Sequence, residues 1–226
     1  MVYYYPQITA EFRDNGPKHE LISCALELDK LGLNRGTSGN VSLRSEQGFF
    51  ITPSGINPSD LVLDSIVEMD FEGNVLSGKN PSSEWRFHRD ILKNKLDVNA
   101  VIHTHSTYAT AFSCLRIPMP PFHYMIAAAG GADIKCANYA VFGSQELSDN
   151  VLKSLYSRRA CFLANHGMIA AGSSLKKALV VAAEVESLAQ QFMILKSAGD
   201  FVLLNDAEMS EVVEKFKKYG SWSISK

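Results

Sequence analysis

Four side chains in the sequence are of the types that bind a transition metal. Glu84 lies in the run Ser-Ser-Glu-Trp-Arg-Phe-His, His103 and His105 form a His-Thr-His pair, and His166 lies in Asn-His-Gly. One carboxylate and three imidazoles suit zinc in tetrahedral geometry. A catalytic zinc site keeps three firm protein ligands and one exchangeable position, so Glu84 is a candidate for a movable fourth ligand. The pattern predicts a catalytic metal site.

Glu84 is expected at the start of a helix. Ser82 is a suitable N-cap for a helix that runs to about Leu96, which places Glu84 in the first turn, near the positive helix end. Two further histidines, His19 and His88, lie on predicted helices without a visible partner. We therefore predict no chemical role for them.

The three histidine ligands are expected where strands end. Residues 98–102 form a predicted buried strand that is followed at once by His103 and His105. Side chains two apart on an extended chain point the same way, so both imidazoles can reach one ion. A second strand, residues 160–164, ends at Asn-His-Gly, and we expect residues 168–171 to continue it.

Two loops of small residues suggest a site for an anion. The first loop, residues 34–40, alternates glycines with short hydroxyl or amide residues and ends at Gly39 and Asn40. The second contains Ser54 and Gly55. Such loops let backbone N–H groups approach an anion closely. Taken alone, the first loop is better explained as a plain connection between a helix and a strand, but two loops that each flank a strand favour one shared anion site.

The remaining pattern predicts one domain of mixed strands and helices. Further helices are expected over residues 17–31, 106–115, 145–156, 175–197 and 207–219, and hairpin strands over 41–44 with 49–52 and 66–69 with 74–76. The sequence contains no repeat, low-complexity tract or linker. We predict a mixed α/β domain over residues 17–226, with a central, mainly antiparallel sheet covered by helices on both faces, after an N-terminal extension of residues 1–16.

The composition is that of an ordinary globular protein. Of 226 residues, 46% are hydrophobic and 20% charged, and the formal net charge of -2 gives no basic field for nucleic acid or an anionic membrane. None of the 4 cysteines forms a C-x-x-C pair, which fits reduced thiols in a cytoplasmic protein. The start lacks the pattern of a signal peptide. The most apolar segment, residues 178–195, contains two glutamates and is expected to be a core helix.

Taken together, the motifs resemble those of the class II aldolase/adducin family. The likeness runs in order over residues 21–220. Its motifs are Gly-Thr-Ser-Gly-Asn (36–40), Thr-Pro-Ser-Gly (52–55), Ser-Ser-Glu-Trp-Arg-Phe-His (82–88), His-Thr-His (103–105), His-Tyr-Met-Ile-Ala-Ala-Ala-Gly (123–130) and Asn-His-Gly (165–167).

The resemblance implies the fold of that family and two sets of ligand-binding residues. One set is the zinc ligands, Glu84, His103, His105 and His166. The other is a phosphate pocket, formed by Gly39, Asn40, Ser54, Gly55, Ser82 and Ser83. The resemblance further implies a homotetramer with active sites between subunits, in which Tyr124 reaches into a neighbouring site. Phe216 and Tyr219 become candidates for closing over the aldehyde end of the substrate.

The implied reaction is that of an aldehyde-lyase. It is the reversible cleavage of a ketose 1-phosphate, foremost L-fuculose 1-phosphate, to dihydroxyacetone phosphate and L-lactaldehyde, with Glu84 as base and Tyr124 as acid. A sugar-phosphate 4-epimerase acting on L-ribulose 5-phosphate, a methylthioribulose-1-phosphate dehydratase and a non-catalytic module like the adducin head stay open. The epimerase relatives usually carry aspartate where Glu84 stands, and the adducin head lacks the metal ligands, so the aldolase is favoured.

Overall fold

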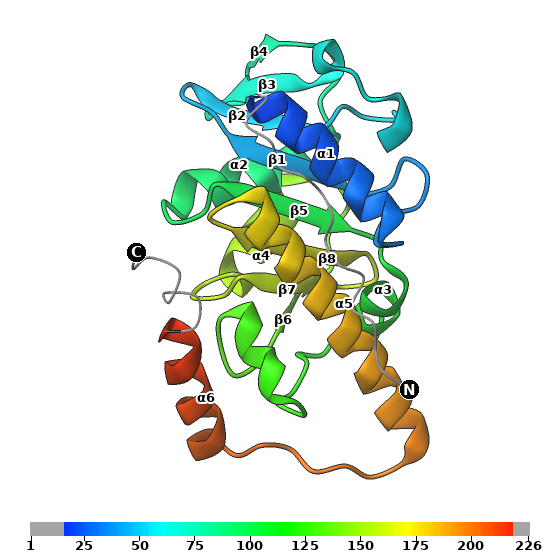
Figure 1. Ribbon diagram of the computed structural model, residues 1–226, viewed down its shortest axis with the longest axis vertical. Coiled ribbons are helices and arrows are strands. Elements are labelled where there is room, and N and C mark those ends of the chain that lie inside the picture. Colours follow the sequence, from blue (N-terminus) through cyan, green and yellow to red (C-terminus); the bar gives the residue numbers. More distant parts are fainter. Residues whose placement is uncertain (1–15, 219–226) are drawn as a thin grey trace, which may run out of the picture.

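The computed structural model describes residues 16–218, so the expected extension over residues 1–16 lies outside it apart from Gly16. At its centre is one eight-stranded sheet with the order β4-β3-β2-β1-β5-β8-β7-β6 (Figure 1). The strands are β1 (Asn40–Arg44), β2 (Gly48–Ile51), β3 (Val67–Asp70), β4 (Val75–Ser77), β5 (Ala100–Thr104), β6 (Lys135–Ala137), β7 (Ala160–Leu163) and β8 (Gly167–Gly172). Only the pair β6–β7 is parallel, which confirms a mainly antiparallel sheet.

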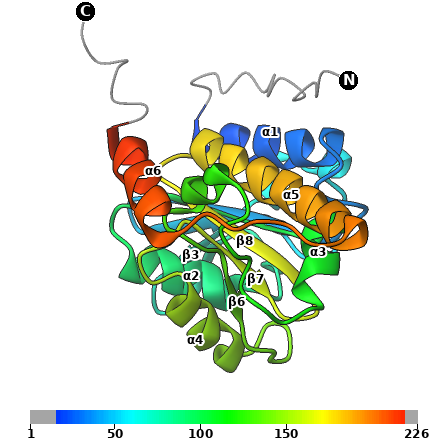
Figure 2. The ribbon, with the colours of Figure 1, turned by 90° about the horizontal axis from the view of Figure 1, so that it is seen from below.

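Helices cover both faces of this sheet, as predicted (Figure 2). One face carries α1 (Pro17–Lys30), α3 (Thr107–Ser113), α5 (Leu175–Ala198) and α6 (Asp206–Lys218), and the other carries α2 (Trp85–Asn94) and α4 (Gln145–Ser154). Three short 3-10 helices are η1 (Pro58–Asp60), η2 (Leu63–Ser65) and η3 (Tyr124–Ala129). Because strand side chains alternate, Ile102 of β5 points into the core under α5, whereas Val101 points into the core under α2.

The long helix α5 is a core helix, as expected. By length and composition alone it could cross a membrane. In the structure it instead lies along β5 and β8, with its apolar side chains in the core on that face. Among them, the Phe192 ring lies 5.1 Å from that of Phe112 on α3, edge to face.

The prediction that residues 168–171 continue the preceding strand is wrong. The chain reverses after β7, because Asn165 adopts a left-handed φ of 53° and the His166 N–H bonds the Leu163 carbonyl at 3.0 Å. β8 therefore returns antiparallel to β7 and pairs on its other side with β5, where His103 lies opposite Ile169. This reversal places His166 beside the end of β5.

The start of α2 also differs from the prediction. The helix begins at Trp85, whose N–H bonds the Ser82 carbonyl at 3.1 Å, and its N-cap residue is Glu84 rather than Ser82. The Ser82 hydroxyl accepts the Glu84 N–H at 3.3 Å. Glu84 thus lies immediately before the helix, still near its positive end. By contrast, Ser144 caps α4 through the Leu147 N–H at 3.1 Å.

Candidate metal centre and active site

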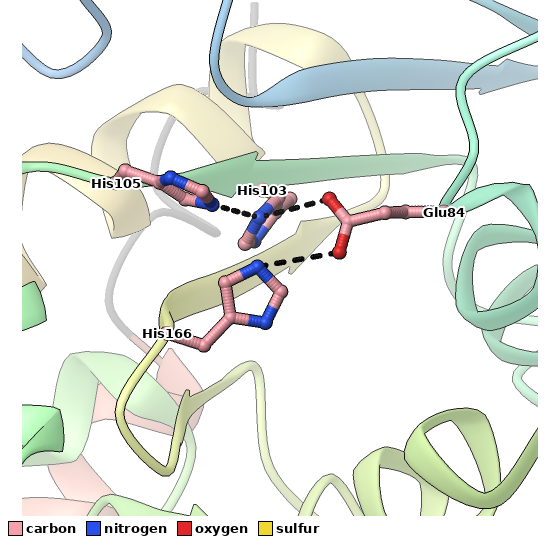
Figure 3. Close-up of side chains that lie close together, drawn as sticks. All are labelled: Glu84, His103, His105 and His166. Atoms are coloured by element: carbon pink, nitrogen blue, oxygen red, sulfur yellow. Dashed lines mark hydrogen bonds and ion pairs between the residues drawn. The ribbon is translucent and has the colours of Figure 1, made fainter. Parts of the chain in front are cut away.

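The four predicted metal ligands lie together, although they come from three separate parts of the chain (Figure 3). Glu84 precedes α2, His103 and His105 come from the end of β5, and His166 comes from the β7–β8 turn. Their ligand atoms all lie within 4.8 Å of one another. The Nε2 atoms of His103 and His105 are 2.9 Å apart, and Glu84 lies 3.2 Å from His103 and 3.3 Å from His166.

The chemistry of these donors fits a transition metal. His103 Nδ1 lies 2.9 Å from the Met168 carbonyl oxygen, which can only accept, so Nδ1 donates and Nε2 faces the other ligands. Glu84 Oε1 is buried and lies 3.3 Å from His166 Nε2, but it accepts no hydrogen bond from any described residue. A buried carboxylate oxygen without a donor, beside three converging imidazoles, suits a bound cation. The cluster can therefore hold a metal ion.

The cluster also has the protonation states that a metal site needs. Burial alone would raise the pKa of Glu84, but His103, His166 and the Asn40 amide outweigh it and hold this pKa well below its usual range. Burial, reinforced by His103, lowers the pKa of His105 to about 4 and that of His166 to about 4. At neutral pH the carboxylate is ionised and these two imidazoles are neutral, which are the forms that bind metal.

The predicted phosphate-binding segments lie next to Glu84. The Ser54 N–H bonds the Asn80 carbonyl at 3.0 Å, and the Ser82 N–H bonds the Thr52 carbonyl at 3.1 Å, which joins two of the segments. The Asn40 amide donates to Glu84 Oε2 at 3.1 Å and brings in the third. Ser54, Gly55 and Ser83 are exposed residues, as contact with a ligand would require. Their role in binding phosphate stays a prediction.

The other predicted residues lie apart from this cluster. Tyr124 begins η3, where it is 51% exposed and its ring lies 4.8 Å from that of His123. Among the described residues, no hydrogen bond or ring contact joins Tyr124 to the four ligands. Its role at a neighbouring site stays a prediction. Phe216 packs, partly buried, against the core under α5. Tyr219 lies outside the described residues.

One residue of the site was missed from the sequence. His88, for which no role was predicted, is fully buried in α2, with Nδ1 2.7 Å from Ser42 Oγ and Nε2 2.5 Å from Asn40 Oδ1. Its partners lie more than 40 residues earlier, so no local pattern reveals them. The signal in the sequence was its position four residues after Glu84, which is one helical turn.

Comparison with known proteins identifies the family. Residues 19–193 match the model of the class II aldolase and adducin N-terminal domain. The chain belongs to this family. It is 49% identical over 203 residues to the 5-methylthioribulose-1-phosphate/5-deoxyribulose-1-phosphate aldolase of Rhodospirillum rubrum, with 90% of this chain and 92% of the relative covered. It is 48% identical over 202 residues to the L-fuculose phosphate aldolase of Escherichia coli, with 89% and 94% covered.

The fold of this class II aldolase agrees with that of a solved relative. A structure of L-fuculose 1-phosphate aldolase superimposes with a TM-score of 0.86 at 43% identity, over 88% of this chain and 95% of the other. The two sequence relatives and this structure are all aldolases. The prediction of an aldolase-type lyase is therefore confirmed.

Proposed function

We propose that this class II aldolase is zinc-dependent and reversibly cleaves a ketose 1-phosphate, L-fuculose 1-phosphate, to dihydroxyacetone phosphate and L-lactaldehyde. The observation behind the proposal is the convergence of Glu84 with three imidazoles beside the predicted phosphate segments. The similarity to L-fuculose phosphate aldolases supports it. We further propose that the enzyme works in the cytoplasm as a homotetramer.

Substrate binding would use the groups that surround Glu84. The phosphate would accept hydrogen bonds from the exposed Ser54 and Ser83 and from backbone N–H groups around Gly39 and Gly55, close to the positive end of α2. Such anchoring orients the reacting carbons. Zinc, when bound, would supply a Lewis acid that stabilises the negative charge developing on the ketone and adjacent hydroxyl oxygens.

The proton transfers fall to Glu84 and Tyr124. In the condensation direction, Glu84 removes a proton from the hydroxymethyl carbon of dihydroxyacetone phosphate, since its carboxylate is ionised at neutral pH. That carbon then bonds to the aldehyde carbon, and Tyr124 of a neighbouring subunit gives its hydroxyl proton to the aldehyde oxygen. Cleavage runs the same steps in reverse.

Exchange of hydrogen at that carbon with deuterated water isolates the step assigned to Glu84. Glu84→Gln should slow the exchange by about 10²-fold or more, whereas phosphate binding survives. Glu72→Gln is the matched control, since it changes an exposed carboxylate between β3 and β4 that pairs with Lys93 of α2. Exchange at the wild-type rate in a Glu84→Gln enzyme that still holds zinc would remove Glu84 as the base.

Tyr124 can be tested separately because it acts on the other half of the reaction. Tyr124→Phe should impair formation of the carbon–carbon bond more than proton exchange. If Tyr124 serves a neighbouring subunit, mixing Glu84→Gln with Tyr124→Phe subunits should restore activity in hybrid oligomers. Equal loss of both steps, or no recovery on mixing, would count against this assignment.

A second candidate substrate is favoured by the Rhodospirillum rubrum relative, whose name specifies 5-methylthioribulose 1-phosphate and 5-deoxyribulose 1-phosphate. All three ketoses give dihydroxyacetone phosphate and differ only in the aldehyde released. A comparison of kcat/KM over the three compounds, by release of dihydroxyacetone phosphate, decides between them. An epimerase would instead invert C4 of L-ribulose 5-phosphate without releasing fragments, and a dehydratase would release water.

A further inference from the structure

Four buried polar side chains form a continuous chain of hydrogen bonds that runs from strand β1 to the candidate metal cluster. Ser42 Oγ of β1 lies 2.7 Å from His88 Nδ1 on α2. His88 Nε2 lies 2.5 Å from Asn40 Oδ1, and Asn40 Nδ2 lies 3.1 Å from Glu84 Oε2. All four residues are buried, with Ser42 and His88 at 0% exposure. Water therefore has little access to this chain.

The bond from Asn40 to Glu84 sets the direction of every other bond in the chain. Asn40 Nδ2 donates to Glu84 Oε2 at 3.1 Å, so the Asn40 oxygen faces His88. That oxygen also only accepts, so His88 Nε2 carries the ring proton. Burial lowers the pKa of His88 to about 3, so the ring is neutral and has one proton. His88 Nδ1 therefore accepts from the Ser42 hydroxyl.

The opposite tautomer of His88 would disturb the site. With the proton on Nδ1, Nε2 would need a donor, and the Asn40 amide would turn its NH2 group toward His88. The Asn40 oxygen would then face Glu84 Oε2 at about the present donor–acceptor distance of 3.1 Å. Two acceptors at that distance repel each other, and a buried unpaired acceptor is costly. The state of the His88 ring thus decides whether Asn40 attracts or repels Glu84.

We propose that His88 is a positioning residue of this active site: as the Nε2–H tautomer, it orients the Asn40 amide so that its NH2 group holds the Glu84 carboxylate in the metal cluster. The importance of this for catalysis rests on the proposed role of Glu84. Asn40 also keeps a second amide proton that does not go to Glu84. The same orientation therefore leaves a donor for a ligand beside the phosphate segments.

The tautomer can be measured directly, without activity. In protein labelled with ¹⁵N-histidine, one-bond N–H coupling should appear on Nε2 of His88 and not on Nδ1, in both zinc-free and zinc-loaded enzyme. The signal is assigned by its loss in His88→Gln. A proton on Nδ1 of His88 in the wild-type enzyme would overturn the proposal.

A pair of amide substitutions separates positioning from simple packing. In His88→Gln the side-chain nitrogen reaches the place of Nε2 and can still donate to Asn40, whereas the shorter side chain of His88→Asn reaches only toward Ser42. We expect His88→Asn to lose about 10–100-fold in zinc affinity and in proton exchange, as is typical for groups that orient metal ligands. His88→Gln should stay within about threefold of the wild type. Equal effects of the two substitutions on both readouts would contradict the proposal.

Ser42→Ala offers a milder test should His88→Asn not fold. Without the hydroxyl donor, His88 loses its bond at Nδ1, but Asn40 still requires a proton on Nε2. The Nε2–H tautomer should therefore persist, and zinc affinity and proton exchange should fall by less than in His88→Asn. Ser148→Ala is the matched control, since it removes an equally buried hydroxyl that donates to Asp90 at 2.6 Å in the contact between α2 and α4. A shift of His88 to the Nδ1–H tautomer in Ser42→Ala that leaves zinc affinity and proton exchange unchanged would refute the coupling.

The two proposals fail in different ways. If Glu84→Gln keeps normal proton exchange, Glu84 is not the base. The predicted tautomer and the loss of zinc affinity in His88→Asn would still support positioning by His88. If instead Glu84→Gln abolishes exchange but the two His88 variants behave alike, the catalytic assignment stands and His88 is only a packing residue.

Discussion

Glu186 fixes the start of α3, directly after His105 of the candidate metal cluster. Its Oε2 accepts the Ser106 hydroxyl at 2.6 Å and the Ala109 N–H at 2.7 Å, and its Oε1 accepts the Tyr108 N–H at 2.8 Å. The N-cap residue Ser106 makes no capping bond of its own to α3. A side chain from α5 therefore supplies the cap, and Glu186→Ala would remove it.

The size of the loss follows from these three bonds. A hydrogen bond to a charged group contributes about 1.5–3 kcal/mol net, and the loss of an N-cap about 1 kcal/mol. Glu186 is only half-buried, so water can replace part of the lost bonding. We therefore expect Glu186→Ala to lower the free energy of unfolding by about 3–5 kcal/mol. In a domain of this size each kcal/mol shifts Tm by about 2–4 °C, so Tm should fall by roughly 6–20 °C.

Urea denaturation at fixed protein and zinc concentrations measures this loss, because both concentrations alter the apparent stability. Hydrogen exchange of the Tyr108 and Ala109 amides should accelerate at the same time, since both lose their acceptor. Gln190→Ala, one turn further along α5, is the control. A loss below about 1 kcal/mol, or unchanged exchange at the two amides, would refute the reasoning.

Three further outcomes are expected. Gly39→Ala should weaken phosphate binding, since Gly39 has a φ of +76° and a β-carbon there would lie 2.3 Å from the buried Asn34 side chain. Gly36→Ala is the control, because Gly36 also has a positive φ, of +61°, but a β-carbon there would meet no neighbouring atom. Equal phosphate affinity in the two variants would contradict this prediction. The buried His88 takes up no proton above pH about 3, whereas its ordinary pKa is 6.5, so its contribution to stability is present at neutral pH and is lost as the pH falls from 6.5 toward 3. Between pH 6 and 4 the free energy of unfolding, measured by denaturation, should therefore fall less steeply with decreasing pH in His88→Gln than in the wild type, by about 1.4 kcal/mol per pH unit. Equal slopes in the two proteins would disprove this prediction. A chelator should abolish activity and lower the unfolding midpoint, with zinc but not magnesium restoring both; full activity without metal would exclude the metal-dependent mechanism.

Part of the candidate metal cluster could be predicted from the sequence because it depends on local geometry. Two histidines two residues apart at the end of a strand share one side, whatever the rest of the fold does. His103 and His105 meet this condition, and the structure brings both to Glu84 and His166. The alternation of apolar residues likewise predicted most strands and both helical layers.

The features that were missed depend on contacts distant along the chain or on turn chemistry. The sequence predicts no role for His88, because Ser42 and Asn40 meet it only after β1 has packed under α2. The β7–β8 reversal differs from the prediction that residues 168–171 continue the strand of residues 160–164. An Asn followed closely by Gly is a signal for a turn, since both tolerate left-handed or close-packed backbone.

The turn between β7 and β8 cannot take an additional residue without disturbing its surroundings. Leu163 and Gly167 are the last paired residues of the two strands, and a β-carbon at Gly167 would lie 2.3 Å from the Thr104 carbonyl oxygen. One inserted residue would either carry His166 off its ligand position or slip β8 by one place, turning its buried side chains to the opposite face. This connection is therefore the wrong place to graft a loop or open the chain for circular permutation, whereas the exposed hairpin between β3 and β4 is a suitable one.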